Sequence, residues 1–231
     1  MRKHIPNTIT CCNLLSGCVA AMYAFEGVYP LAFVFIIAGA VFDFFDGLSA
    51  RALGVSSPIG KELDSLADVV TFGFAPAAMV FSWLRECADA HLDMLAAFVV
   101  PFAAFLLVAF SALRLAKFNV DERQTTSFIG LPTPANALFW GAIVLGSHDI
   151  VVAAPYGWIA VLSLVVLFSY LLVAEIPMFS LKLKNLSWKA NRITYIFLLV
   201  SLILLIFLGL NGLSAVIGWY IILSVLTPKR A

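Results

Sequence analysis

The chain has 231 residues, of which 63% are hydrophobic and 12% are charged, and its formal net charge at pH 7 is +1. The charged share is about half of the roughly 25% that is usual in soluble domains, and the mean hydropathy is +1.03. This composition excludes a soluble globular domain. We also expect no nucleic-acid partner.

Apolar runs near 20 residues recur along the chain, and each could cross a hydrocarbon core of about 30 Å. We therefore predict an all-α, polytopic membrane helix bundle with about eight transmembrane helices. The predicted spans are 5–25, 29–50, 60–84, 92–118, 134–147, 156–175, 191–210 and 212–227. The fifth span is short, and only Asn211-Gly212 separates the last two, so seven spans are an alternative.

The basic residues in the loops and near the ends of the spans test this count independently. With eight spans, thirteen of the fourteen Lys and Arg residues fall on one side and only Arg85 falls on the other. Positive charge marks the cytoplasmic side, so both termini are predicted to face the cytoplasm. The opposite side carries the acidic residues Glu26, Glu86, Asp89, Asp93 and Asp149. Surface positions are expected for three histidines that form no cluster, namely His4, His91 and His148.

Four aspartates stand in the stretch from residue 41 to residue 68 of this apolar chain. Asp43 and Asp46 lie near the end of one predicted helix, and Asp64 and Asp68 lie near the start of the next. At spacings of three and four, each pair shares a helix face, and the two helices must run back alongside each other. Four such charges in low dielectric repel strongly unless cations neutralise them. Oxygen ligands without Cys or His indicate Mg²⁺, Mn²⁺ or Ca²⁺.

Small and basic residues beside the aspartates indicate a bound diphosphate. Gly47 and Ala50 would let a phosphate approach the helix closely, and Arg51 supplies a guanidinium for its oxygens. The alternative is a group of helix-end charges on a solvated surface. That alternative explains Lys61-Glu62 well, but it explains poorly why acidic residues line one face of the next apolar helix.

This stretch resembles the signature of the CDP-alcohol phosphotransferase family. The match reads D-F-F-D-G-L-S-A-R, eight further residues, and then G-K-E-L-D-S-L-A-D. It is complete at every defining position: Asp43, Asp46, Gly47, Ala50, Arg51, Gly60, Asp64 and Asp68. Since nearly every residue belongs to one bundle, we predict a single domain over 1–231. Its core would be 1–175, with two extra C-terminal spans at 191–227.

The resemblance implies that an alcohol hydroxyl displaces CMP from a CDP-linked lipid in one in-line attack. It implies two divalent metal ions, Mg²⁺ or Mn²⁺, held by Asp43, Asp46, Asp64 and Asp68. Asp68 would also be the catalytic general base toward the hydroxyl. The CDP-lipid site would comprise Thr10, Asn13, Gly47, Ala50, Arg51 and Gly60. For Thr10 and Asn13, helix-to-helix hydrogen bonding is the alternative.

Two further stretches resemble the phosphatidylserine synthase branch of the family, namely S-A-L-R-L-A-K-F-N and F-I-G-L-P-T-P-A-N-A. This resemblance implies CDP-diacylglycerol and L-serine as substrates. A site for the serine carboxylate should offer a guanidinium, for which Arg114 is the candidate, with Lys117 and Arg123 as helpers. For these three residues, cytoplasmic positive charge alone is the alternative. Gly130 and Pro132 either shape the acceptor pocket or only terminate a loop.

Two other functions are alternatives. The same chemistry could use another alcohol, such as glycerol 3-phosphate or an inositol phosphate. A divalent-cation or proton-coupled transporter would also carry acidic residues in its spans, but it should show repeated halves or broken helices, and no repeat is apparent. The family resemblance suggests a homodimer. We expect an integral protein of the cytoplasmic (inner) membrane, in contact with the lipid bilayer, whose active site faces the cytoplasm.

Overall fold

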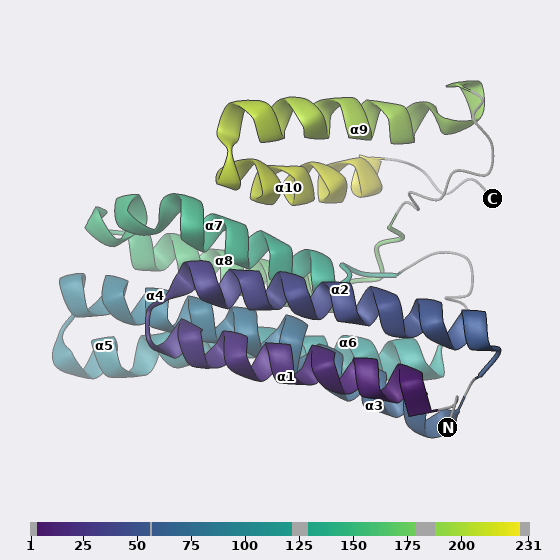
Figure 1. Ribbon diagram of the computed structural model, residues 1–231. Helices are drawn as coiled ribbons and strands as arrows, with labels where there is room; N and C mark the ends of the chain where they lie inside the picture. Colours follow the sequence, from purple (N-terminus) through teal and green to yellow (C-terminus); the bar gives the residue numbers. More distant parts are fainter. Residues whose placement is uncertain (1–3, 56, 122–128, 179–187, 227–231) are drawn as a thin grey trace.

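The computed structural model describes residues 4–55, 57–121, 129–178 and 188–226 (Figure 1). Over these ranges the chain is almost entirely helical, and its extended segments form one isolated bridge, between Ile129 and Pro177. The elements are α1 (Ile5–Phe25), α2 (Tyr29–Leu53), α3 (Pro58–Asp68), η2 (Val69–Phe74), α4 (Ala75–His91), α5 (Met94–Val99), η3 (Val100–Phe105), α6 (Leu106–Val120), α7 (Thr133–Ala153), α8 (Gly157–Val173), α9 (Trp188–Leu208) and α10 (Leu210–Leu226). The all-α prediction is confirmed.

Several of these elements join end to end into longer rods. α3, the π-helical turn η2 and α4 form one rod over Pro58–His91, and α5, η3 and α6 form another over Met94–Val120. Within the described ranges, six helices are long and apolar enough to cross a membrane, while α8 and α10 are apolar helices of 17 residues each. The chain is therefore a polytopic helical membrane protein. The count of eight spans and the orientation of the termini stay predictions.

Several predicted boundaries differ from the structure, and the largest difference is at the third span, since α4 runs to His91 and not to residue 84. α7 runs to Ala153, past the predicted end of the fifth span at residue 147. The break between the last two helices lies at Gly209, whose φ of +55° favours glycine. Asn211 and Gly212, which were predicted to form this break, belong to α10. Asn211 instead fastens α10 to α7, because its Nδ2 donates to the Gly146 carbonyl at 2.9 Å.

The helices lie side by side in one bundle, and the α9–α10 pair rests against it through α10 and α7 (Figure 1). The start of α1 and the end of α10 lie at the same end of the bundle. We call this the aspartate end, because α2 ends and α3 begins there. The opposite end, which we call the far end, carries the connections from α1 to α2, from α4 to α5 and from α7 to α8.

Close packing among α1, α2 and η2 fixes the depth of the aspartates. Gly17 and Gly39 face Thr71, and a Cβ on Gly17 would lie 2.7 Å from the Thr71 Cα. The buried Thr71 hydroxyl donates to the Asn13 carbonyl at 2.9 Å. Since η2 follows Asp68 directly, this contact holds the end of α3 against α1. Small residues thus let three helices meet closely just below the acidic side chains.

Candidate active site

Three aspartates from two helices converge at the aspartate end. Asp43 of α2 and Asp64 and Asp68 of α3 each offer a carboxylate oxygen, and these atoms all lie within 4.8 Å of one another. Asp68 is buried, whereas Asp43 and Asp64 are half-buried. The Asp64 Oδ1 atom is buried and finds no hydrogen-bond partner among the described residues. Carboxylates this close together in an apolar bundle cannot all stay ionised unless cations or protons are bound, and oxygen ligands of this kind suit a hard divalent cation.

The fourth aspartate of the motif is turned toward α1. Asp46 is buried, and its Oδ2 accepts a hydrogen bond from the Thr10 hydroxyl at 2.5 Å. Asp46 lies outside the set of three, yet it is near enough to repel Asp43 and Asp64. The structure therefore places Asp46 at the border of the cluster, with one oxygen already engaged by Thr10.

Asn13 of α1 contacts the most buried of the three clustered aspartates. Its Nδ2 donates to Asp68 Oδ1 at 3.3 Å, while its own Oδ1 is buried and unpartnered in the described part of the chain. Thr71 holds the Asn13 backbone from the other side. Thr10 and Asn13 thus each bond one aspartate across a helix interface, which agrees with the helix-to-helix alternative and leaves room for a ligand role.

A cavity of about 520 Å³ lies beside the aspartates, within the size range of small-molecule sites. A Cβ added at Gly47 would have open space around it. The lining residues are Pro6, Asn7, Thr10, Asp46, Gly47, Ala50, Gly54, Val55, Ser57, Gly60, Lys61 and Asp64. Of the residues predicted to bind the CDP-lipid, four therefore line this cavity, namely Thr10, Gly47, Ala50 and Gly60.

Two basic residues near this cavity differ from expectation. Arg51 is exposed on the last turn of α2 and is not among the lining residues. Lys61, which sequence reasoning treated as a surface charge, lines the cavity, and its Nζ donates to the Asn119 carbonyl at 2.8 Å. Its position directly after Gly60, inside the G-K-E-L-D segment of the motif, was the available signal. Asn7, one turn before Thr10 on α1, was missed as well.

Arg114 of α6 connects the aspartates with a second cavity. Its side chain is only 7% exposed, it interacts electrostatically with Asp68 and Tyr220, and its Nε has no partner in the described ranges. The second cavity measures about 260 Å³. It is lined by Arg114, Lys117, Val120, Asp121, Ile129, Leu172, Val173 and Glu175. Two cations and two carboxylates therefore line a small space, and one of them, Arg114, also interacts with Asp68.

Two residues predicted to shape the acceptor pocket, Gly130 and Pro132, are not part of this lining. Gly130 is buried at a φ of +77°, and its N–H donates to the Ile176 carbonyl at 2.9 Å. A Cβ at Gly130 would lie 2.6 Å from the Leu172 carbonyl oxygen. Pro132 stands in extended conformation just before α7. Neither residue lines a described cavity near Arg114, and Arg123 lies outside the described residues.

The chain is similar to known proteins over the region that carries these residues. The sequence model of the family described as CDP-alcohol phosphatidyltransferase matches residues 3–169, which include all four aspartates. CDP-diacylglycerol–serine O-phosphatidyltransferase of Bacillus subtilis is 37% identical over 136 residues, covering 57% of this chain and 70% of that protein. The Helicobacter pylori (strain 26695) protein of the same name is 30% identical over 225 residues, covering 96% of this chain and 89% of that protein. The chain thus belongs to the CDP-alcohol phosphatidyltransferase family.

Proposed function

We propose that this chain transfers the phosphatidyl group of CDP-diacylglycerol to the hydroxyl of L-serine, giving phosphatidylserine and CMP. One observation carries the proposal: Asp43, Asp64 and Asp68 converge within 4.8 Å beside a cavity of about 520 Å³. Relatives that match the chain are named for this reaction. Four carboxylates at one end of the bundle also favour this reading over a transporter, whose sites lie near the midplane.

The clustered carboxylates have the chemistry of a divalent-metal site. Asp43, Asp64 and Asp68 would be ligands, and Asp46 would join them through the oxygen that Thr10 leaves available. The unpartnered Asp64 oxygen fits this role, and Mg²⁺ or Mn²⁺ is the expected ion, with two ions expected. When bound, such ions neutralise the diphosphate oxygens and stabilise the departing CMP.

The larger cavity is the proposed site of the CDP-lipid. Its wall contains three small residues, Gly47, Ala50 and Gly60, so a diphosphate can approach the helix backbone closely. Lys61 adds a positive charge to this wall. Arg51, which follows Ala50 on the last turn of α2, stays a proposed contact to the phosphate oxygens.

The smaller cavity is the proposed site of serine. Arg114 would bind the serine carboxylate and Lys117 would assist it, while Asp121 and Glu175 on the same lining would face the ammonium group. Gly130 and Pro132 would act indirectly, by holding the segment that starts at Ile129 against the end of α8. A serine held by Arg114 would lie close to Asp68, with which Arg114 interacts.

In the proposed reaction the serine oxygen bonds to the phosphorus that carries diacylglycerol. Its proton passes to Asp68, and the bond from that phosphorus to the CMP oxygen breaks, with CMP keeping the electron pair. The Asn13 amide orients Asp68 by binding one of its oxygens. A serine hydroxyl is a poor nucleophile near neutral pH, so a carboxylate base in reach contributes directly to the rate.

We further propose that the aspartate end faces the cytoplasm of a bacterial-type inner membrane, because the basic residues in the loops and near the ends of the spans gather on that side. CDP-diacylglycerol and serine would then meet at this membrane face. The family resemblance suggests a homodimer and a single domain over 1–231, with a core at 1–175 and extra spans at 191–227.

The test is CMP release by the purified protein with CDP-diacylglycerol and Mn²⁺ or Mg²⁺. Serine, glycerol 3-phosphate, an inositol phosphate and no acceptor are compared, each with and without a chelator. Metal-dependent release with serine alone is the expected result. Release with another acceptor would overturn the serine assignment and keep the four-aspartate chemistry. No release by folded protein with any acceptor would overturn the enzyme proposal.

A further inference from the structure

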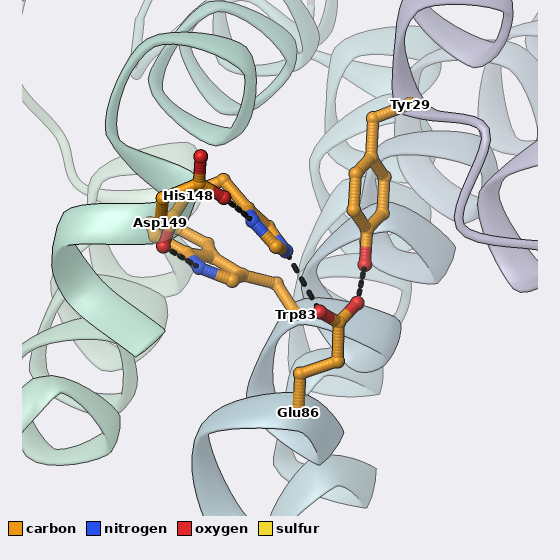
Figure 2. A network of polar contacts seen from close by, with 5 residues as sticks. All are labelled: Tyr29, Trp83, Glu86, His148 and Asp149. Atoms are coloured by element: carbon orange, nitrogen blue, oxygen red, sulfur yellow. Dashed lines mark hydrogen bonds and ion pairs between the residues drawn. The ribbon is translucent and has the colours of Figure 1, made fainter. Parts of the chain in front are cut away.

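A chain of polar contacts joins three helices at the far end of the bundle (Figure 2). The Tyr29 hydroxyl of α2 donates to Glu86 Oε1 of α4 at 2.5 Å. The other oxygen of Glu86 lies 3.0 Å from Nε2 of His148 on α7. His148 Nδ1 lies 2.8 Å from Asp149 Oδ1, and Trp83 donates to the His148 carbonyl at 3.4 Å. This arrangement corrects the expectation that His148 is an isolated surface residue.

The imidazole ring of His148 lies between two carboxylates. Both ring nitrogens face carboxylate oxygens, and a neutral imidazole would turn one lone pair toward a carboxylate. A ring that carries two hydrogens and a positive charge would attract both carboxylates. The contact to Glu86 is a close ion pair whose angle falls short of a hydrogen bond.

The contact between His148 and Glu86 is the sheltered one. The His148 side chain is 21% exposed and that of Glu86 is 44% exposed, whereas Asp149 is fully exposed, so its ion pair adds little. From the packed neighbours, Tyr29 of α2 and Glu86 of α4 face the ring, and nearby α10 offers the uncharged Asn211. A cavity of about 350 Å³ borders Tyr29 and His148, which gives protons a route to the ring.

These contacts join the two helical rods that carry the motif aspartates, namely α2 and the rod over Pro58–His91. Tyr29 begins α2, which bears Asp43 near its other end, and Glu86 lies on the Pro58–His91 rod, which bears Asp64 and Asp68. Helical rods are stiff, and a shift of one residue moves a side chain by about 1.5 Å along the axis. The relative position of the rods at the far end therefore affects how closely the carboxylates approach at the aspartate end.

We infer that Tyr29, Glu86 and His148 are positioning residues, which form a proton-dependent clamp that sets the register of the two aspartate-bearing rods. This inference rests on the metal site of the proposed function. The clamp is complete when His148 is protonated, and it is lost as the pH rises until the ring gives up a proton. Metal affinity at the aspartate end should follow the state of the clamp.

The test measures Mn²⁺ affinity, from the resonance signal of free Mn²⁺, in the wild type and His148→Gln. The matched control is Asp89→Asn, which neutralises an exposed carboxylate near Glu86 on the same helix. Measurements at about pH 6 and about pH 8 bracket histidine ionisation. Ratios of variant to wild type cancel the titration of the site aspartates and of His91, which contacts the Val152 carbonyl.

We expect His148→Gln to bind Mn²⁺ about threefold to tenfold more weakly than the wild type at the lower pH, and equally at the higher pH. Asp89→Asn should match the wild type at both. Equal affinity of His148→Gln and wild type at both pH values, or an equal loss at both, would overturn the clamp.

A second measurement does not depend on metal. In chelator, the unfolding temperature of the wild type should exceed that of His148→Gln by more at the lower pH than at the higher. The same difference at both values would overturn the clamp. If the wild type binds no Mn²⁺ at all, the metal site of the proposed function fails and so does the coupling, while the unfolding temperatures still decide whether the proton-dependent contact exists.

Discussion

The two ends of this bundle differ in how their carboxylates are partnered. At the aspartate end, Asp43, Asp64 and Asp68 converge and a buried Asp64 oxygen lacks a partner among the described residues. At the far end, Tyr29 and His148 occupy the two oxygens of Glu86. Within a membrane bundle, ionisable groups that satisfy one another can fasten helices, whereas groups left unsatisfied indicate a ligand. The aspartate end is therefore the proposed ligand site, and the far end is the proposed structural support.

The largest effect is expected from removing the proposed base at the aspartate end. Asp68→Asn should lower the rate of CMP release by about a hundredfold to ten-thousandfold, the range that general-base catalysis contributes. Binding of CDP-lipid should suffer less in Asp68→Asn than in Asp43→Asn, because the general-base role acts on the hydroxyl. Steady-state CMP release together with lipid-binding measurements checks both statements. Full activity in Asp68→Asn would remove the base assignment.

The next effect concerns the acceptor cavity. Arg114→Gln should raise KM for serine by about tenfold to a hundredfold, because a charge-assisted contact to the carboxylate is lost. The matched control is Lys117→Gln on the same lining, whose exposed side chain should matter less. Serine and CDP-diacylglycerol are varied separately in the assay. A rise in KM for CDP-diacylglycerol with KM for serine unchanged would contradict the assignment.

A third prediction compares the two ends by the sign of a stability change. In metal-free buffer, Asp64→Asn should raise the unfolding temperature by about 2–4 °C, since it relieves repulsion among clustered carboxylates. Glu86→Gln should lower that temperature by a similar amount, since it removes the negative charge beside His148. Unfolding of both variants is followed in the same detergent. A shift of the same sign in both would show that the two ends do not differ in this way.

The smallest effect on stability is expected from the Tyr29 hydroxyl, which donates to Glu86 at the far end. Tyr29→Phe removes one hydroxyl and keeps the ring that lies 5.1 Å from His148, centroid to centroid. Loss of that hydrogen bond should cost about 0.5–1.5 kcal/mol of unfolding free energy. Equilibrium unfolding at neutral pH measures it. A loss as large as that in Glu86→Gln would place the hydroxyl, rather than the ion pair, at the centre of these contacts.

Much of this molecule could be predicted from local patterns. Long apolar runs indicated membrane helices because a span must satisfy its own backbone. The spacing of Asp43 and Asp46, and of Asp64 and Asp68, placed each pair on a helix face. Gly209 shows the limit of such reasoning, since Asn211-Gly212 carried a similar turn signal and was chosen in its place.

Contacts between helices distant in sequence decided the rest. Asp46 turns to Thr10 across 36 residues, Lys61 reaches Asn119 across 58, and His148 meets Glu86 from another helix. Periodicity states which face of a helix a residue occupies, but it does not state which residue of another helix lies opposite. That partner depends on how closely the helices approach, which the glycines facing Thr71 determine by packing. The residues that make up the sites could therefore be predicted from the sequence. Which of them contact one another was decided by the tertiary structure.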